Sequence, residues 1–205
     1  MTAQLIVIGG SAGALDVLLE LAGGLPDAAE VPIVIALHVQ ASHPSLVPEL
    51  IARTSRRPVR EVEDKLALEP RTIYVAPPNY HVLVERDRTL ALSVDPPVHY
   101  SRPSIDVLFE SAADSLGAAV LGVVLSGANE DGAHGLLRIY QAGGTAAVQD
   151  PATALYPAMP AAAARAVGPG VRSLAIAQLA RLFADLGGGL DGGLGGMTPQ
   201  QDALR

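Results

Sequence analysis

The sequence predicts an α/β protein with a doubly wound, mainly parallel β-sheet flanked by helices, and with a β-hairpin insertion. Apolar runs of strand length alternate with segments of helical periodicity, which is the pattern of repeated βα units. Of the 205 residues 49% are apolar, enough for the core of one large domain. Only 3% are aromatic and none is Trp, so the core is aliphatic, as in parallel sheets covered by helices.

The individual elements follow from the local pattern. Continuous apolar runs predict strands at 5–8, 32–37, 118–125 and 145–149, with a short last strand at 171–176. Helical spacing predicts helices after the first strand, from about Pro44, from Ser101–Ser104 with Pro103 near the start, from about Ala133, around 160–167 and over 178–186. Between 58 and 94 short runs are broken by Pro and charge. Two of them, 80–84 and 89–94, flank a polar turn and indicate the hairpin, which we expect to decorate the main sheet.

We expect one domain over residues 1–186 and a Gly-rich, flexible C-terminal tail over 187–205. The net charge of −7 and the lack of a long basic run argue against a nucleic-acid partner. The absence of Cys excludes disulfides, thiolate catalysis and zinc sites with sulfur ligands. No signal peptide and no membrane-spanning run is evident, so we expect a cytoplasmic location and no membrane insertion.

A serine between two glycines follows the first strand. The spacing Gly9-x-Ser11-x-Gly13 at a strand-to-helix turn fits a nucleophile elbow, which aims the hydroxyl out of the strand end. Free N–H groups of the following helix favour an oxyanion there. Two other interpretations stand beside it. Ser11 is also a favoured helix N-cap residue, and a dinucleotide-binding loop needs glycine where Ser11 stands.

Two further apolar strands lead to residues that complement a serine nucleophile. His38 follows the second strand and is the candidate base, and Asp131 follows the strand at 118–125 and is the candidate orienter of the imidazole. Sites in open α/β sheets form at the carboxyl ends of strands. His134 is the rival base, and Glu130 is the rival orienter.

Backbone N–H groups near these residues are candidate oxyanion donors. The Ala12 N–H follows Ser11, and the loop 127–129 offers the N–H of Ala128. Such donors each supply about 3 kcal/mol of transition-state stabilisation. No residue pattern indicates a cofactor or a metal site.

The chain resembles the catalytic domain of the chemotaxis protein-glutamate methylesterases (CheB type). The resemblance covers roughly residues 5–186, and its motifs are collinear. They are Ile8-Gly9-Gly10-Ser11-Ala12-Gly13-Ala14, Leu37-His38-Val39, Arg102-Pro103-Ser104-Ile105-Asp106-Val107-Leu108-Phe109, Leu125-Ser126-Gly127-Ala128-Asn129-Glu130-Asp131-Gly132-Ala133, Asp150-Pro151-Ala152-Thr153-Ala154 and Met159-Pro160.

The resemblance implies a serine hydrolase that cleaves glutamyl methyl esters on chemoreceptor signalling helices and can deamidate certain receptor glutamines. It assigns Ser11 as nucleophile, His38 as base and Asp131 as orienter. The chain order Ser…His…Asp differs from that of α/β-hydrolases. Two other functions stay open: a non-catalytic receptor-binding module, and a serine hydrolase for another ester or amide.

The chain departs from the family pattern in two respects. Ala12 and Ala14 stand where the family often has Thr and Gly, and Ala128-Asn129 replaces Met-Gly in the aspartate loop. A backbone donor survives these changes, whereas pocket shape is open to change. Many family members also carry an N-terminal receiver domain that blocks the site. This chain begins near the catalytic domain, so we expect a stand-alone member controlled, if at all, by a separate regulatory partner.

Overall fold

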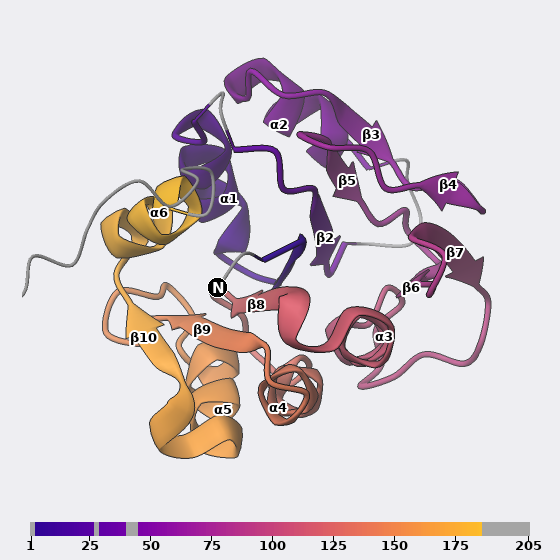
Figure 1. Cartoon of the computed structure of the whole chain (residues 1–205). Coiled ribbons are helices and arrows are strands. Elements are labelled where there is room, and N and C mark those ends of the chain that lie inside the picture. The colour runs from indigo at the N-terminus through magenta and orange to yellow at the C-terminus, as the bar shows by residue number, and fades with distance from the viewer. Residues whose placement is uncertain (1–2, 27–28, 40–44, 186–205) are drawn as a thin grey trace, which may run out of the picture.

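A computed structural model describes residues 3–26, 29–39 and 45–185. Its main sheet has seven strands in the order β10-β9-β8-β1-β2-β5-β3, and every pairing in it is parallel. The predicted parallel sheet is confirmed (Figure 1). Its strands are β1 (Leu5–Gly10), β2 (Ile33–Leu37), β3 (Val59–Glu61), β5 (Ile73–Val75), β8 (Val120–Val124), β9 (Thr145–Gln149) and β10 (Arg172–Leu174).

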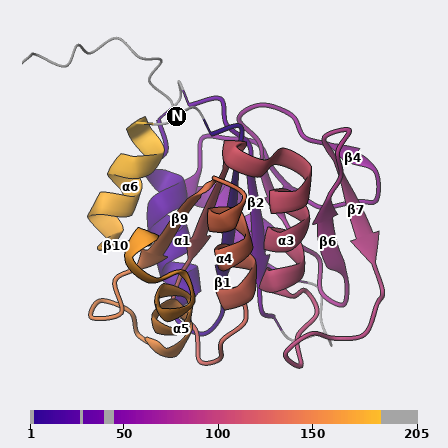
Figure 2. The ribbon, with the colours of Figure 1, turned by 60° about the horizontal axis from the view of Figure 1, so that its bottom comes forward.

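Helices cover both faces of this sheet. Figures 1 and 2 show α3 (Ile105–Leu116), α4 (Ala133–Gln141) and α5 (Ala158–Val167) on one face, and α1 (Ala14–Gly23), α2 (Val47–Thr54) and α6 (Ile176–Asp185) on the other. Two apolar clusters separate these layers. Leu5 and Val7 of β1 face the first cluster, and Ile6 and Ile8 face the second. Because both faces are buried, the strand reads as an unbroken apolar run.

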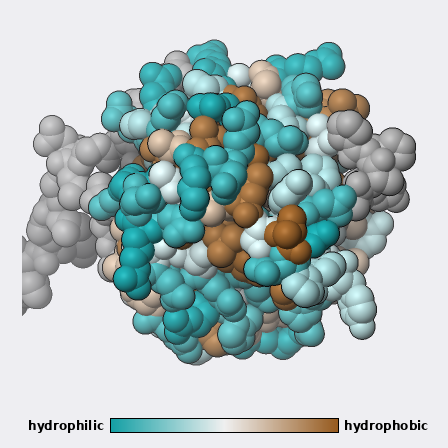
Figure 3. All heavy atoms as spheres, turned by 90° about the vertical axis from the view of Figure 1, so that its right-hand side faces the viewer, coloured by the Kyte–Doolittle hydropathy of each residue, from teal (hydrophilic) through white to brown (hydrophobic). Residues whose placement is uncertain are grey.

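The predicted hairpin forms, but it does not join the main sheet. β6 (His81–Val84) and β7 (Thr89–Ser93) pair antiparallel, and β4 (Leu66–Ala67) adds to β7 in a separate three-stranded sheet. This sheet is held by α3, because the Ser111 Oγ accepts from the Val84 N–H at 3.0 Å and the Ser115 Oγ donates to the Val84 carbonyl at 2.7 Å. Figure 3 shows this side of the molecule, which is mostly hydrophilic with a narrow hydrophobic band across it.

The strand order places three carboxyl ends side by side. β1 lies between β2 and β8, with Gly10 paired to Leu37 and Gly9 paired to Val124. The chain first extends the sheet on the β2 side and then returns to β8, so β1 marks the topological switch point. Ligand sites of doubly wound sheets form at this position.

Helix α3 begins later than the sequence predicts. It starts at Ile105, with Ser104 as its N-cap, and the Arg102–Pro103 peptide bond before it is cis. Pro103 therefore lies outside the first turn, because the Ser104 side chain accepts from the Val107 N–H and fixes the start there. The start of α3 also touches β1, since a Cβ on Gly9 would overlap the Ile105 side chain.

Two predictions concern residues that the structure does not describe. The predicted helix start at Pro44 and the predicted tail over 187–205 lie outside the described residues. Among the described helices, none combines the length and apolarity that crossing a bilayer requires. 3₁₀ turns at η1 (Gly117–Ala119) and η2 (Gly168–Gly170) precede β8 and β10.

Candidate active site

Ser11 stands in a tight turn between β1 and α1. Its N–H donates to the Ser126 carbonyl at 2.9 Å, and its carbonyl accepts from the Ala14 N–H at 3.1 Å. The N-cap of α1 is Gly13, at φ 76° and without a side-chain cap. The interpretation of Ser11 as a capping serine is therefore wrong. Glycine is required at position 13, because a Cβ there would also lie 2.8 Å from the Ser126 Oγ.

His38 lies directly beside this turn. It follows β2, and its N–H donates to the Gly10 carbonyl at 3.1 Å. Its Nε2 lies 2.7 Å from the Asp131 Oδ2, and its side chain is 11% exposed. Its Nδ1 lies 3.3 Å from the Ser101 Oγ. Within the described residues, no hydrogen bond joins the Ser11 hydroxyl to His38.

Asp131 is fully buried and accepts four hydrogen bonds. Besides His38, the donors are the Ser104 hydroxyl at 3.0 Å, the Ile105 N–H at 2.8 Å and the Asp106 N–H at 3.0 Å. Burial by itself raises the pKa of a carboxyl group, but the bonds from His38 and from the two backbone N–H groups outweigh it and lower the pKa of Asp131. The carboxylate therefore stays ionised, and because a carboxylate only accepts hydrogen bonds, the neutral His38 ring that faces it has its N–H at Nε2.

The alternative base and the alternative orienter, His134 and Glu130, are both exposed. The His134 Nδ1 pairs with the Glu110 Oε1 at 2.7 Å, and its side chain is 69% exposed. Glu130 is exposed beside the buried Asp131. The geometry therefore favours His38 and Asp131 over both alternatives.

The two candidate oxyanion donors have free N–H groups. Within the described residues, neither the Ala12 N–H nor the Ala128 N–H donates a hydrogen bond. Gly127 fixes the loop before Ala128, since its N–H donates to the Tyr156 carbonyl and its carbonyl accepts from Met159, both at 3.0 Å. A free, preorganised N–H is what an oxyanion hole requires.

Asn129, which stands where the family pattern has Gly, does not disturb this loop. It is absent from the non-glycine residues with positive φ in the described chain. Its Oδ1 accepts from the Asp131 N–H at 3.2 Å, which is an Asx turn. The position needs no glycine, and Asn129 helps to hold Asp131.

Several supporting residues could not be found from the sequence pattern alone. Ser126 is fully buried, and its Oγ donates to the Ala12 carbonyl at 2.8 Å while its N–H donates to the Gln149 Oε1 at 3.0 Å. It thus joins the Ser11 turn to the end of β9. His81 is also buried and accepts from the Ser104 N–H at 3.1 Å. Polar residues at the ends of apolar strands are the one available signal for Ser126 and Gln149.

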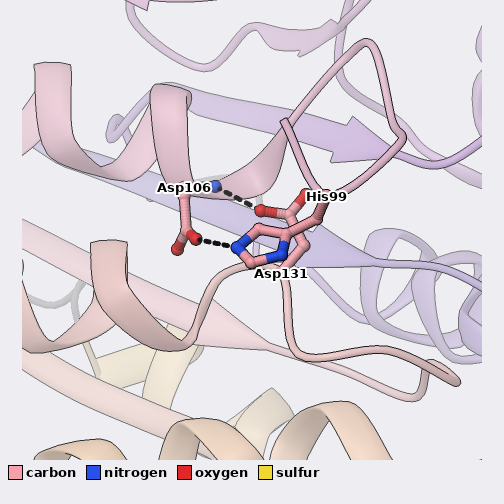
Figure 4. A group of neighbouring side chains, drawn as sticks. All are labelled: His99, Asp106 and Asp131. Carbon is pink, nitrogen blue, oxygen red and sulfur yellow. Dashed lines mark hydrogen bonds and ion pairs between the residues drawn. The ribbon is translucent and has the colours of Figure 1, made fainter. Parts of the chain in front are cut away.

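One cluster near the site has the composition of a metal site. Ligand atoms of His99, Asp106 and Asp131 lie within 4.8 Å of one another (Figure 4). Both Asp131 oxygens already accept two hydrogen bonds each, and the Asp106 Oδ1 accepts from the Gly135 N–H at 2.7 Å. Only the Asp106 Oδ2 and the His99 Nε2 remain, which is fewer than the three or four protein ligands of a zinc site.

The pKa of the Asp106 carboxyl group is raised in this cluster. Burial raises the pKa of its carboxyl group, and the nearby charges of Asp131 and Glu110 add to the increase. The Gly135 N–H and His99 act in the opposite direction without overcoming it. The Asp106 side chain thus accepts from the first turn of α4, while its own N–H donates to the Asp131 carboxylate.

The mouth of the site carries exposed apolar side chains. A cavity of about 300 Å³ opens beside His38 and is lined in part by Asn79, Tyr100 and Ser101. Tyr100 is fully exposed, and Leu155 is 72% exposed. Leu155 lies against the Ser11 turn, since a Cβ on Gly13 would be 2.9 Å from it.

Comparisons with known proteins indicate the family and the fold of this chain. A family model described as CheB methylesterase matches residues 6–183. A "putative protein-glutamate methylesterase/protein-glutamine glutaminase" of Leptospira interrogans is 40% identical over 183 residues, covering 89% of this chain and 94% of that protein. A protein-glutamate methylesterase/protein-glutamine glutaminase of Methanospirillum hungatei is 36% identical over 183 residues, which are 89% of this chain and 52% of the relative.

The fold has a solved counterpart. The crystal structure of the Thermotoga maritima CheB methylesterase catalytic domain matches with a TM-score of 0.82 at 23% identity, covering 91% of this chain and all of that one. At this identity the likeness concerns the fold.

Proposed function

This chain belongs to the CheB methylesterase family, and we propose that it is a protein-glutamate methylesterase that hydrolyses glutamyl methyl esters on chemoreceptors through Ser11, His38 and Asp131. The observation that carries the proposal is the 2.7 Å bond between the His38 Nε2 and the buried Asp131, at the sheet edge where the Ser11 turn lies. Family membership supports the activity, and this geometry supports the residues that perform it.

The proposed reaction begins at the free nitrogen of His38. Because Asp131 holds Nε2, the base is Nδ1, which takes the Ser11 proton as Oγ attacks the ester carbonyl. The N–H groups of Ala12 and Ala128 stabilise the oxyanion. The tetrahedral intermediate collapses, and the methoxide takes the proton from Nδ1 and leaves as methanol. A water molecule, deprotonated by Nδ1, then hydrolyses the glutamyl ester of Ser11 and restores the site.

Deamidation follows the same sequence with a glutamine side chain. Ammonia leaves in place of methanol, and the product is again a glutamate carboxylate. The amide is the less reactive substrate, so this step depends more strongly on protonation of the leaving group. We therefore propose the glutaminase activity as a second reaction of the same three residues.

The proposed partner is a cytoplasmic signalling helix of a chemoreceptor. A helix presenting a glutamyl ester has an apolar side, and exposed Tyr100, Leu155 and Tyr156 surround the site at 103%, 72% and 44% exposure. The proposed place of action is accordingly the cytoplasm. A separate regulatory partner remains a prediction from the sequence.

Methanol release from methylated receptor fragments tests the function. Ser11→Ala should reduce the rate by at least about 10³-fold without altering the fold, since the nucleophile is lost. Ser173→Ala, an exposed substitution on β10, is the matched control and should keep the full rate. Ser11→Ala activity near that of the control would exclude Ser11 as the nucleophile.

A panel of esters and amides addresses the alternatives. Faster turnover of a substrate unrelated to glutamate would favour a different serine hydrolase. Receptor binding without turnover of any ester would favour a binding module. The free N–H of Ala128 and the undisturbed Asn129 turn favour catalysis over binding alone.

A further inference from the structure

The proposed reaction uses the His38 Nδ1 as its base, and in the structure another hydroxyl already lies within hydrogen-bonding distance of this nitrogen. Asp131 holds the His38 Nε2, which leaves Nδ1 as the one imidazole nitrogen with a free lone pair. The hydroxyl that lies on Nδ1 is that of Ser101, with an Oγ–Nδ1 distance of 3.3 Å. Ser11 lies on the neighbouring strand end, and within the described part of the chain its hydroxyl forms no hydrogen bond with His38.

A tight turn presents Ser101 to His38. The Ser101 N–H donates to the Val98 carbonyl at 2.8 Å, and the Val98 N–H donates to the Ser101 carbonyl at 3.2 Å. The two residues between them, His99 and Tyr100, have φ of 48° and 61°. Two consecutive residues with positive φ are typical of a type I′ turn. The turn has one defined shape, which fixes the position of Ser101.

Two contacts hold this turn from either side. The His99 Nε2 lies 3.4 Å from the Asp106 Oδ2 (Figure 4). Arg102 donates from Nη1 to the Val94 and Asp95 carbonyls at 2.7 and 3.0 Å. The position of Ser101 over His38 is therefore supported by contacts independent of the Ser101 hydroxyl.

We propose that Ser101 is a positioning residue that occupies the Nδ1 of His38 in the substrate-free enzyme, in place of Ser11. Asp131 is ionised, so His38 is protonated on Nε2 and Nδ1 is an acceptor. The Ser101 hydroxyl then donates to it. Its other acceptor is the His99 carbonyl at 3.4 Å, which is the more distant of the two.

The Ser101 contact competes with activation of Ser11. Nδ1 has one lone pair, so it can interact with the Ser101 hydroxyl or with the Ser11 hydroxyl, but not with both. Ser11 is activated only after Ser101 has released the nitrogen. The contact therefore lowers the reactivity of Ser11 in the resting enzyme and fixes the plane of the imidazole ring at both nitrogens.

Nitrogen NMR of the His38 ring tests the contact without using activity. In Ser101→Ala the Nδ1 resonance should move toward that of a nitrogen without a hydrogen-bond donor. In Ser101→Thr, which keeps the hydroxyl, and in Ser11→Ala it should stay at the wild-type position. An unchanged Nδ1 resonance in Ser101→Ala, or a change in Ser11→Ala, overturns the proposal.

Reaction with a small sulfonyl fluoride tests the consequence, and this measurement rests on the proposed role of Ser11. The reagent forms a sulfonyl ester with the Ser11 Oγ and releases fluoride, while His38 takes the proton. Loss of one ordinary hydrogen bond at Nδ1 should make Ser101→Ala react about threefold to tenfold faster than wild type. Ser101→Thr should react at the wild-type rate.

The outcomes separate the two proposals. A rate in Ser101→Ala that equals or falls below that of wild type overturns the inference about Ser101. Labelling that persists in Ser11→Ala instead contradicts the proposed nucleophile, and the NMR result for Ser101 is unaffected by it.

Discussion

Asp131 performs two tasks that substitution can separate. It binds His38, and it also caps α3, because three of its four hydrogen bonds come from the Ser104 hydroxyl and from the N–H groups of Ile105 and Asp106. Asp131→Ala should therefore lower both stability and activity. His38→Ala removes one donor from Asp131 and leaves the other three, so it should abolish activity at a much smaller cost in stability.

The expected free energies follow from these contacts. In Asp131→Ala the N–H groups of Ile105 and Asp106 lose their acceptor inside the protein, at about 1–3 kcal/mol each. The His38 bond is lost as well, and we expect a decrease of about 3–5 kcal/mol in the free energy of unfolding. His38→Ala leaves no buried N–H without a partner there and should cost about 1–2 kcal/mol.

Urea unfolding of the two variants beside wild type measures these differences, and methanol release measures activity. Both variants should be inactive, and Asp131→Ala should unfold at a clearly lower urea concentration than His38→Ala with a similar slope. Equal unfolding midpoints for the two variants would refute the capping role of Asp131. Wild-type turnover by His38→Ala would refute the assignment of the base.

Three further predictions concern the surroundings of the site. Gly9→Ala should lower the free energy of unfolding by about 1–3 kcal/mol in urea, because its Cβ overlaps Ile105; an unchanged midpoint would contradict this close approach. The raised pKa of Asp106 means that its ionised form destabilises the fold progressively as pH rises above about 4. Asp106→Asn should flatten this part of the stability–pH curve, and an identical curve would refute the reasoning. Tyr100→Ser should raise KM for receptor fragments and leave hydrolysis of a small ester unchanged; equal effects on both substrates would exclude Tyr100 as a docking residue.

The sequence predicted β1, β2, β8 and β9 well because these strands are buried on both faces along nearly their whole length. Thr145–Gln149 matches β9 at both ends, and the run at 32–37 contains β2. The hairpin was also recognisable from its polar turn. The attachment of the hairpin to α3 could not be recognised in this way. It depends on Ser111 and Ser115, which lie about thirty residues further along the chain than Val84, the hairpin residue that they bind.

The candidate site was predictable to the extent that it lies at strand ends. The pattern pointed to Ser11, His38 and Asp131, and the structure brings His38 and Asp131 into direct contact. Ser101 had no comparable signal. It reaches His38 through a turn whose positive-φ residues are His99 and Tyr100. Histidine is enriched at positive φ, but the His-Tyr pair lacks the Asn-Gly or Asp-Gly composition that predicts a type I′ turn.

The start of α3 explains how a buried Asp131 can remain charged. Burial raises the pKa of the Asp131 carboxyl group, and the hydrogen bond from His38 acts against this increase. The N–H groups of Ile105 and Asp106, at the positive end of a helix, lower that pKa further. The segment 102–109 therefore contributes to catalysis through its backbone. A change that moves the first turn of α3 should reduce activity by raising the pKa of Asp131, even where every side chain of the proposed triad is intact.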